Sequence, residues 1–179
     1  MARIFAGFAR ITSRADSVQV AAVCYRRTDS SVEFLLVKTS AGKWTFPKGR
    51  LNPSMSASES AAQEAWEEAG AHGRISEKHF GSYLDTKRAL GHDARTREIR
   101  IVAYLLEVYS TVVPEESGRR PTWFAARDAK KLLAEGRASV YGSQIGRIVD
   151  LAVKQLTMAK RSRSSVLVGA QSRRLVPAR

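Results

Sequence analysis

Residues 44–71 read WTFPKGRLNPSMSASESAAQEAWEEAGA and decide the fold. The second half of this stretch is rich in alanine and glutamate, which are strong helix formers. Ser56 with Glu59 three residues later has the pattern of a capping box, and Gly70 is typical of a helix C-terminus. The stretch therefore predicts a short strand over 44–46, a loop that turns at Pro47 and Gly49, and a helix over 57–69.

The predicted helix carries three glutamates with helical spacing. Glu64, Glu67 and Glu68 stand at positions i, i+3 and i+4, so a helix places them on one face, where their charges repel one another. A solvated helix surface is one interpretation of such a cluster. A divalent cation is the other, because Mg²⁺ prefers hard oxygen ligands and commonly bridges carboxylates to substrate phosphates. The spacing alone leaves both interpretations open.

The residues around the glutamates favour the metal. Phe46-Pro47-Lys48-Gly49, followed by Gln63-Glu64-Ala65-Trp66-Glu67-Glu68-Ala69-Gly70-Ala71, resembles the Nudix box of the Nudix hydrolase superfamily. The residues in register with that pattern are Gly49, Glu64, Ala65, Glu67, Glu68, Gly70 and Ala71. The resemblance covers roughly Val18 to Leu156 and includes the Trp44 and Trp123-Phe124 strands. It is nearest to the diphosphoinositol polyphosphate and diadenosine polyphosphate hydrolase branch.

Two positions of the box depart from the pattern. Met55 stands where the family has a glutamate, and Gln63 where it has an arginine. In the family these two chiefly form a supporting pair, and losing both charges together leaves neither one unpaired. We infer a neutral replacement by Met55 and Gln63 that keeps the shape of the loop. The competing inference is a misplaced helix and a weak or inactive enzyme.

The resemblance implies an α/β fold, a Nudix-like α/β/α sandwich with a mixed central sheet. It implies a phosphoanhydride hydrolase (a pyrophosphohydrolase) that uses Mg²⁺, with Mn²⁺ as an alternative, held by Glu64, Glu67, Glu68 and the Gly49 carbonyl. Glu64 is the first candidate for the catalytic base. Family members differ in this respect, and the other available carboxylates are Asp85, Asp93, Glu98, Glu115 and Glu116.

Basic residues indicate a substrate with many phosphates. The candidates for substrate binding precede the helix or lie in a basic connection later in the chain, and they are Lys43, Lys48, Arg50, Lys87, Arg88 and Arg97. Each of them alone is more often a solvated surface charge than a ligand. The expected substrates are a diadenosine polyphosphate, a diphosphoinositol polyphosphate or a nucleoside diphosphate derivative.

The remaining pattern predicts a layered domain over 17–157. Strands are expected at 18–25, 33–38, 74–84, 98–109 and 122–124, and helices at 128–135 and 143–160. A basic connection that includes His92 and Arg95 should join the strands at 74–84 and 98–109. We expect a basic extension over 1–16 and a basic, flexible tail over 158–179, which contains six lysines and arginines and no acid.

The formal net charge of +13 keeps a second class of function open. The basic tails and the two departures from the box favour a Nudix-fold module that binds nucleic acid or protein without turnover, whereas the three glutamates oppose it.

No apolar stretch is long enough to cross a bilayer, and the only cysteine, Cys24, excludes an intrachain disulfide. We therefore expect a cytoplasmic protein without a secretory signal, and leave a homodimer open.

Overall fold

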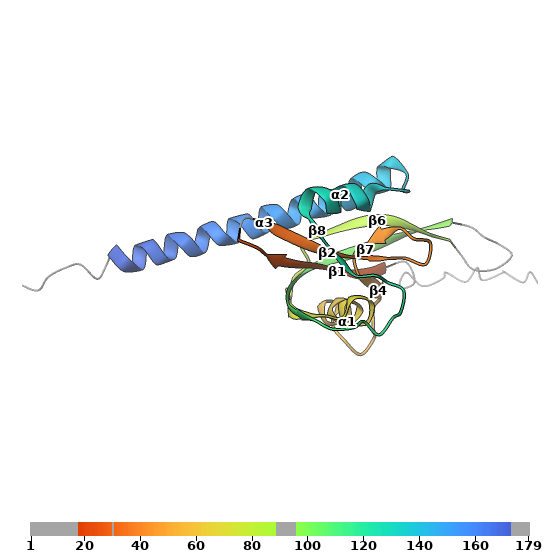
Figure 1. Cartoon of the computed structure of the whole chain (residues 1–179), viewed down its shortest axis with the longest axis horizontal. Helices are drawn as coiled ribbons and strands as arrows, with labels where there is room; N and C mark the ends of the chain where they lie inside the picture. Colours follow the sequence, from red (N-terminus) through yellow and green to blue (C-terminus); the bar gives the residue numbers. More distant parts are fainter. Residues whose placement is uncertain (1–17, 30, 89–95, 173–179) are drawn as a thin grey trace, which may run out of the picture.

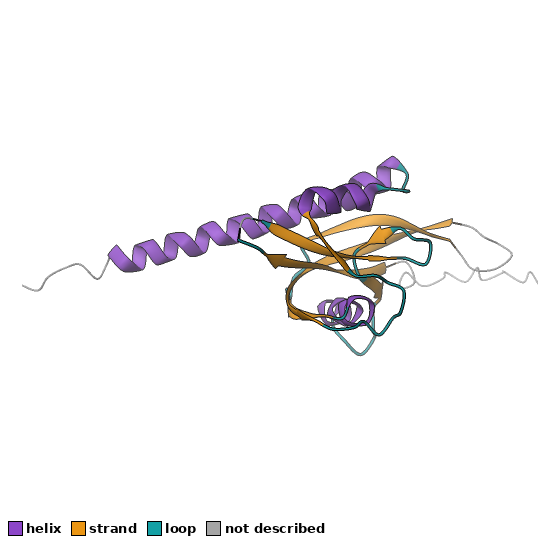
Figure 2. Cartoon of the chain, in the orientation of Figure 1, coloured by secondary structure: helices purple, strands orange, loops and turns teal. Residues whose placement is uncertain are grey.

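The computed structural model describes residues 18–29, 31–88 and 96–172, and describes the side chains of its last helix only as far as residue 159. One mixed sheet lies between α1 on one face and the helices α2 and α3 on the other (Figures 1 and 2). The strands are β1 (Val18–Arg27), β2 (Val32–Lys38), β3 (Trp44–Thr45), β4 (Lys48–Arg50), β5 (Ala71–Ile75), β6 (Gly81–Arg88), β7 (Thr96–Thr111) and β8 (Thr122–Ala125). The helices are α1 (Ala57–Ala69), α2 (Ala126–Ala134) and α3 (Ser139–Ser172).

The centre of the sheet is a parallel pair, β1 and β7, and the other recorded pairings are antiparallel. The strand order is β3-β2-β1-β7-β5, while β4 pairs with β1, β6 with β7 and β8 with β2. Alternate residues of β1 face opposite layers, as expected for a strand that is buried on both sides. Val23 contributes to the core under α2 and α3, and Cys24 to the core under α1. The predicted mixed α/β sandwich is confirmed.

Helix α1 begins and ends as the sequence predicts. The Ser56 hydroxyl accepts a hydrogen bond from the Glu59 backbone N–H, and the Glu59 carboxylate accepts one from the Ser56 N–H. Gly70 ends the helix in a left-handed conformation, with φ of 61°. The small side chains of Ala61 and Ala65 are fully buried against the sheet, so this helix packs close to β1 and keeps its glutamates near the strands.

The predicted strand over 74–84 is wrong. The chain forms β5 and β6 instead, both paired with the long strand β7, and between them only the Ser76 and Phe80 N–H groups still donate to β7 carbonyls in the described structure. The Ser76 hydroxyl contributes to the interruption, because it accepts the Leu105 N–H in place of a backbone carbonyl and donates to the Lys78 carbonyl.

The basic connection is shorter than predicted. Lys87 and Arg88 belong to β6 and Arg97 to β7, because the ladder of the two strands continues as far as the Arg88–Thr96 pair. Residues 89–95, with His92, Asp93 and Arg95, lie outside the described residues.

The prediction that the last helix ends at residue 160 is also wrong. Helix α3 continues to Ser172, and the predicted domain boundary at 157 falls inside it. The basic residues Arg161 and Arg163 carry no core pattern, but no proline interrupts this segment, so the helix can continue beyond the sheet (Figure 1). Within the described chain no helix has the length and apolar character that a membrane span requires.

Candidate active site

The C-terminal half of α1 presents the three predicted glutamates to different surroundings. Glu68 is the most buried, at 2% exposure. Its Oε2 accepts a hydrogen bond from the Lys48 backbone N–H at 3.2 Å, and its Oε1 pairs with an Arg119 guanidinium nitrogen at 2.7 Å. Both oxygens of this buried carboxylate therefore have a donor, as a buried charge requires.

Glu64 lies against the backbone of Gly49. A β-carbon built on Gly49 would overlap the Glu64 carboxylate, so a larger residue here would displace that carboxylate. Burial is the main cause that raises the pKa of Glu64 to about 7; the neighbouring Glu68, Glu67 and Glu116 carboxylates contribute to this rise and Lys48 opposes it. Glu64 therefore lies in a partly buried place where other carboxylates disfavour its charged form.

Glu67 is held by the residue that replaces the arginine of the box. The Gln63 amide nitrogen donates to Glu67 Oε1 at 2.7 Å, and the Gln63 amide oxygen accepts from the Asn52 side chain at 3.3 Å. The Met55 side chain is 42% exposed, and its backbone N–H donates to the Asn52 carbonyl. The neutral side-chain link between loop and helix is Asn52 with Gln63, and the inferred replacement of the charged pair by Met55 and Gln63 stays a prediction.

The loop between β7 and β8 completes the cluster from outside the box. It is tied to the end of α1 by hydrogen bonds from the Val112 N–H to the Gly70 carbonyl and from the Glu116 N–H to the Glu67 carbonyl. The Glu116 carboxylate pairs with the same Arg119 guanidinium group that binds Glu68. Arg119 was missed by the sequence analysis, because it lies in a polar loop without a periodic pattern. Glu116 was only one of five alternative carboxylates.

The other candidate bases have different partners. Asp85 forms an ion pair with Arg137 at 3.2 Å, Glu98 accepts a hydrogen bond from the Tyr141 hydroxyl, and Glu115 accepts one from the Trp66 indole. Asp93 lies outside the described residues. Glu116 is thus the outside candidate that the described structure brings into contact with the cluster.

The predicted substrate-binding residues are divided between two places. Lys48 lies at the cluster, where burial lowers its pKa and the charges of Glu68 and Asp85 oppose that shift. Its neighbour on β4, Arg50, is exposed, and Lys43 borders Gly136 in the turn between α2 and α3. Lys87 and Arg97 pair with each other across β6 and β7, next to Arg88 and the residues that are not described. The side chains of Lys87 and Arg88 lie outside the described part of the structure, so the substrate-binding role predicted for them stays a prediction.

The donor atoms of the cluster have the chemistry that Mg²⁺ prefers, namely carboxylate oxygens and a nearby backbone carbonyl. In the described part of the chain, however, no three acidic, histidine or cysteine side chains are arranged so that they could already hold a metal ion. The hydrogen bonds above give the reason, since Glu68 is turned toward Arg119 and Glu67 toward Gln63. Metal binding would require these two side chains to exchange partners.

Comparison with known proteins gives the family. Residues 17–142 match the family model described as NUDIX domain. The chain belongs to the NUDIX domain family. Diphosphoinositol polyphosphate phosphohydrolase 2 of Rattus norvegicus is 30% identical over 122 residues, which cover 64% of this chain and 62% of that protein. The chain thus spans about three fifths of the length of this relative. Diphosphoinositol polyphosphate phosphohydrolase 3-beta of Bos taurus is 29% identical over 123 residues, which cover 64% of this chain and 68% of that protein.

Solved structures share the NUDIX fold with this chain. A C. elegans Ap4A hydrolase binary complex has a TM-score of 0.58 at 20% identity and covers 79% of this chain and 98% of its own. The NUDIX domain of Shewanella oneidensis NrtR, complexed with ADP ribose, has a TM-score of 0.55 at 15% identity. The match covers 78% of this chain and 87% of that one. At these identities the likeness concerns the fold, and it matches the sandwich seen in Figure 2.

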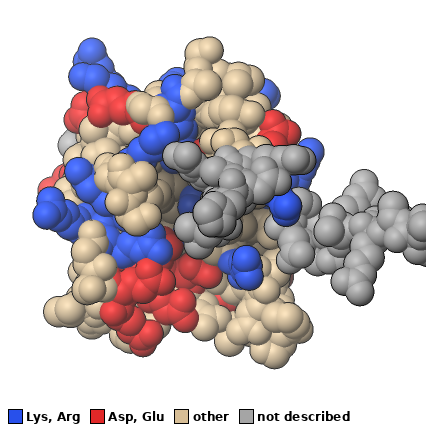
Figure 3. Space-filling model, turned by 90° about the vertical axis from the view of Figure 1, so that its right-hand side faces the viewer, with Lys and Arg blue, Asp and Glu red and all other residues tan. Residues whose placement is uncertain are grey.

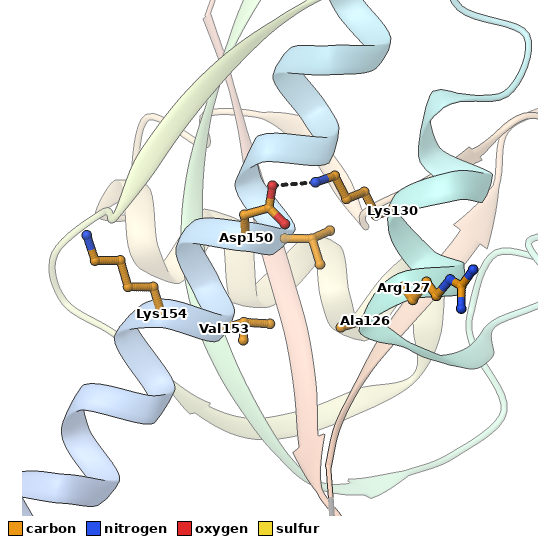
Figure 4. A pocket seen from close by; sticks show the side chains of 7 residues that line it. Ala126, Arg127, Lys130, Asp150, Val153 and Lys154 are labelled. Carbon is orange, nitrogen blue, oxygen red and sulfur yellow. Dashed lines mark hydrogen bonds and ion pairs between the residues drawn. The ribbon is translucent and has the colours of Figure 1, made fainter.

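A shallow groove lies between α2 and α3 (Figure 4). Ala126, Val149 and Val153 form its apolar wall, and its only carboxylate, Asp150, is paired with Lys130. It lies in the helical layer on the opposite face of the sheet from α1. The groove therefore lacks the free carboxylates that metal-dependent chemistry needs.

Proposed function

We propose that this NUDIX-domain protein hydrolyses a phosphoanhydride bond in a polyphosphorylated small molecule with Mg²⁺ as its cofactor. The observation that carries the proposal is the clustering of carboxylates beside β4: Glu64 lies against Gly49, Glu68 accepts the Lys48 N–H, and Arg119 joins Glu68 to Glu116. Carboxylates that repel one another in a partly buried place are stabilised by a divalent cation. Mn²⁺, which also accepts oxygen ligands, would serve as a substitute.

The residues that would hold the metal are Glu64, Glu67, Glu68 and the Gly49 carbonyl. When bound, the metal supplies Lewis acidity toward a phosphoryl oxygen and a more acidic water. Glu64 is the proposed base: it accepts the proton of the attacking water as the new P–O bond forms and the bridging P–O bond breaks. The leaving phosphate keeps the electron pair of that bond. A bound divalent cation would lower the raised pKa of Glu64 and so keep this base ionised near neutral pH.

The basic residues support a polyphosphorylated substrate. Lys48, on β4, lies at the cluster and would contact a phosphate there, while Arg50 ends the same strand and Lys43 precedes β3. Figure 3 shows acidic side chains gathered beside a band of lysine and arginine side chains on one face of the molecule. The names of the relatives support two substrate classes, diphosphoinositol polyphosphates and the diadenosine polyphosphates to which Ap4A belongs.

The test is product release from a panel that contains a diphosphoinositol polyphosphate, diadenosine polyphosphates and ADP-ribose. Each substrate is incubated with the full chain and Mg²⁺, with Mn²⁺ instead, and with a chelator. The proposal predicts metal-dependent cleavage of a phosphoanhydride in at least one substrate. The absence of metal-dependent turnover across the panel would contradict it.

A binding module without turnover is the second candidate, and the donors already placed on Glu68 favour it. It predicts association with nucleic acid that persists in a chelator and weakens steeply with salt. Metal-dependent turnover, together with nucleic-acid association that does not weaken with salt, would contradict the binding module.

A further inference from the structure

Arg119 forms ion pairs with two carboxylates of the cluster. One of its guanidinium nitrogens lies 2.7 Å from Glu68 Oε1 and 2.6 Å from Glu116 Oε2, and its Nε donates to Glu116 at 2.7 Å. It thus joins a carboxylate of α1 to a carboxylate of the loop between β7 and β8. The Arg119 side chain is itself 23% exposed, whereas that of Glu68 is 3% exposed. A charged guanidinium in this position neutralises the deepest carboxylate of the site.

The backbone of the loop fixes Arg119 in place. Its carbonyl accepts a hydrogen bond from the Lys38 N–H at 2.6 Å, at the end of β2. Gly118 before it has φ of 82°, and Arg120 after it has φ of 50°, a conformation that L-residues other than glycine seldom adopt. Arg120 is the one described non-glycine residue with a positive φ. Strain of this kind persists where the surrounding contacts require it, here on both sides of Arg119.

A metal ion that takes Glu68 Oε1 as a ligand must replace the Arg119 guanidinium there. We infer that Arg119 competes with the divalent cation for Glu68 and thereby sets the metal affinity of the site. This inference rests on the proposed function, because it assumes that Glu68 is a metal ligand. After the exchange Arg119 keeps its bonds to Glu116 and its N–H groups toward Glu68 become free, so it is a positioning residue that couples metal binding to the β7–β8 loop.

The test is direct Mn²⁺ binding to the full chain, by calorimetry and by electron paramagnetic resonance of free Mn²⁺. Arg119→Gln removes the competing charge, and we expect it to bind Mn²⁺ about tenfold more tightly than the unaltered chain. Without metal its melting temperature should be lower, because Glu68 loses its partner, and saturating Mn²⁺ should abolish the difference. Arg74→Gln is the matched control. It removes an exposed arginine of β5 that pairs with Glu107 of β7.

Arg119→Lys keeps the charge and serves if Arg119→Gln does not fold. A lysine lacks the forked guanidinium donors that hold both carboxylates at once, so we expect Mn²⁺ to bind about threefold more tightly. Unchanged or weaker Mn²⁺ binding in the Arg119 variants, with binding by the unaltered chain intact, would overturn this inference alone. An unaltered chain that binds no Mn²⁺ would overturn the inference and the proposed metal site together.

Discussion

The carboxylate of Glu64 lies so close to the α-carbon of Gly49 that no side chain fits between them. This contact joins β4 to the middle of α1. It explains why the loop carries a glycine here although its φ is not in the left-handed region. The Gly49 carbonyl and the Glu64 carboxylate are thereby brought into one proposed metal site.

Gly49→Ala should reduce turnover more than it reduces stability. The added methyl group must push the Glu64 carboxylate aside, and a misplacement of about 1 Å costs on the order of 10²-fold in rate. The side chain of Glu64 can rotate away, so the fold should survive. Steady-state kinetics and thermal melting check this prediction, and a variant with normal kcat/KM would contradict it. Gly146→Ala, in α3, is the control, because the added methyl group meets only the flexible Lys130 side chain.

Glu64→Gln should stabilise the fold above neutral pH when a chelator is present. Burial and the neighbouring carboxylates raise the pKa of Glu64 from 4.5 to about 7, so the folded chain holds this proton more tightly than the unfolded chain does. Wild-type stability is therefore fully present below about pH 4.5 and declines as the pH rises toward 7.

Glutamine at position 64 removes that decline. At pH 8 the variant should exceed the wild type by roughly 1 to 2 kcal/mol, after allowance for solvent screening, and at pH 4 the two should be equal. Urea unfolding at several pH values gives the difference. If the free energies of unfolding of the two proteins change in parallel with pH, Glu64 does not have a raised pKa in the folded chain.

Arg137→Met should destabilise the whole domain. Arg137 pairs with Asp85 on β6 and donates to the carbonyls of Trp44 and Leu133, so it ties α2 to β3 and β6. Its side chain is 4% exposed, and removing it leaves Asp85 unpaired in a buried place. We expect a loss of about 3 to 5 kcal/mol in the free energy of unfolding. Lys130→Met, which breaks the exposed pair with Asp150, should change it by less than about 1 kcal/mol.

Gln63→Leu should loosen the turn and release Glu67. The variant loses the hydrogen bonds to Asn52 and Glu67, which we expect to reduce stability by about 1 to 2 kcal/mol. Met55→Leu is the control, since Met55 is exposed and has no part in this link. Equal unfolding free energies for the two variants would remove the assigned role of Gln63.

The sequence was sufficient for α1 and its glutamates, because alanine content, a capping box and a terminal glycine all indicate the same helix. It was not sufficient for the partners of those glutamates. Asn52 and Arg119 lie in irregular loops, where periodicity carries no information about which side chains meet. The break at Ser76 was missed for a similar reason, since one hydroxyl there replaces ladder hydrogen bonds in the middle of an apparently continuous strand pattern. The full length of α3 was missed because helix formation beyond the core leaves no apolar stripe.

The most direct test of the proposed metal-dependent hydrolysis is the turnover of the best substrate from the panel by Glu67→Gln, with Glu59→Gln as the matched control. Both variants change one α1 glutamate to its isosteric amide, but Glu59 lies in the capping box, away from the cluster. We predict that Glu67→Gln lowers kcat at saturating Mg²⁺ by about 10²-fold or more, whereas Glu59→Gln retains wild-type turnover. Equal turnover of the Glu67→Gln variant and the wild type at every Mg²⁺ concentration would contradict the account.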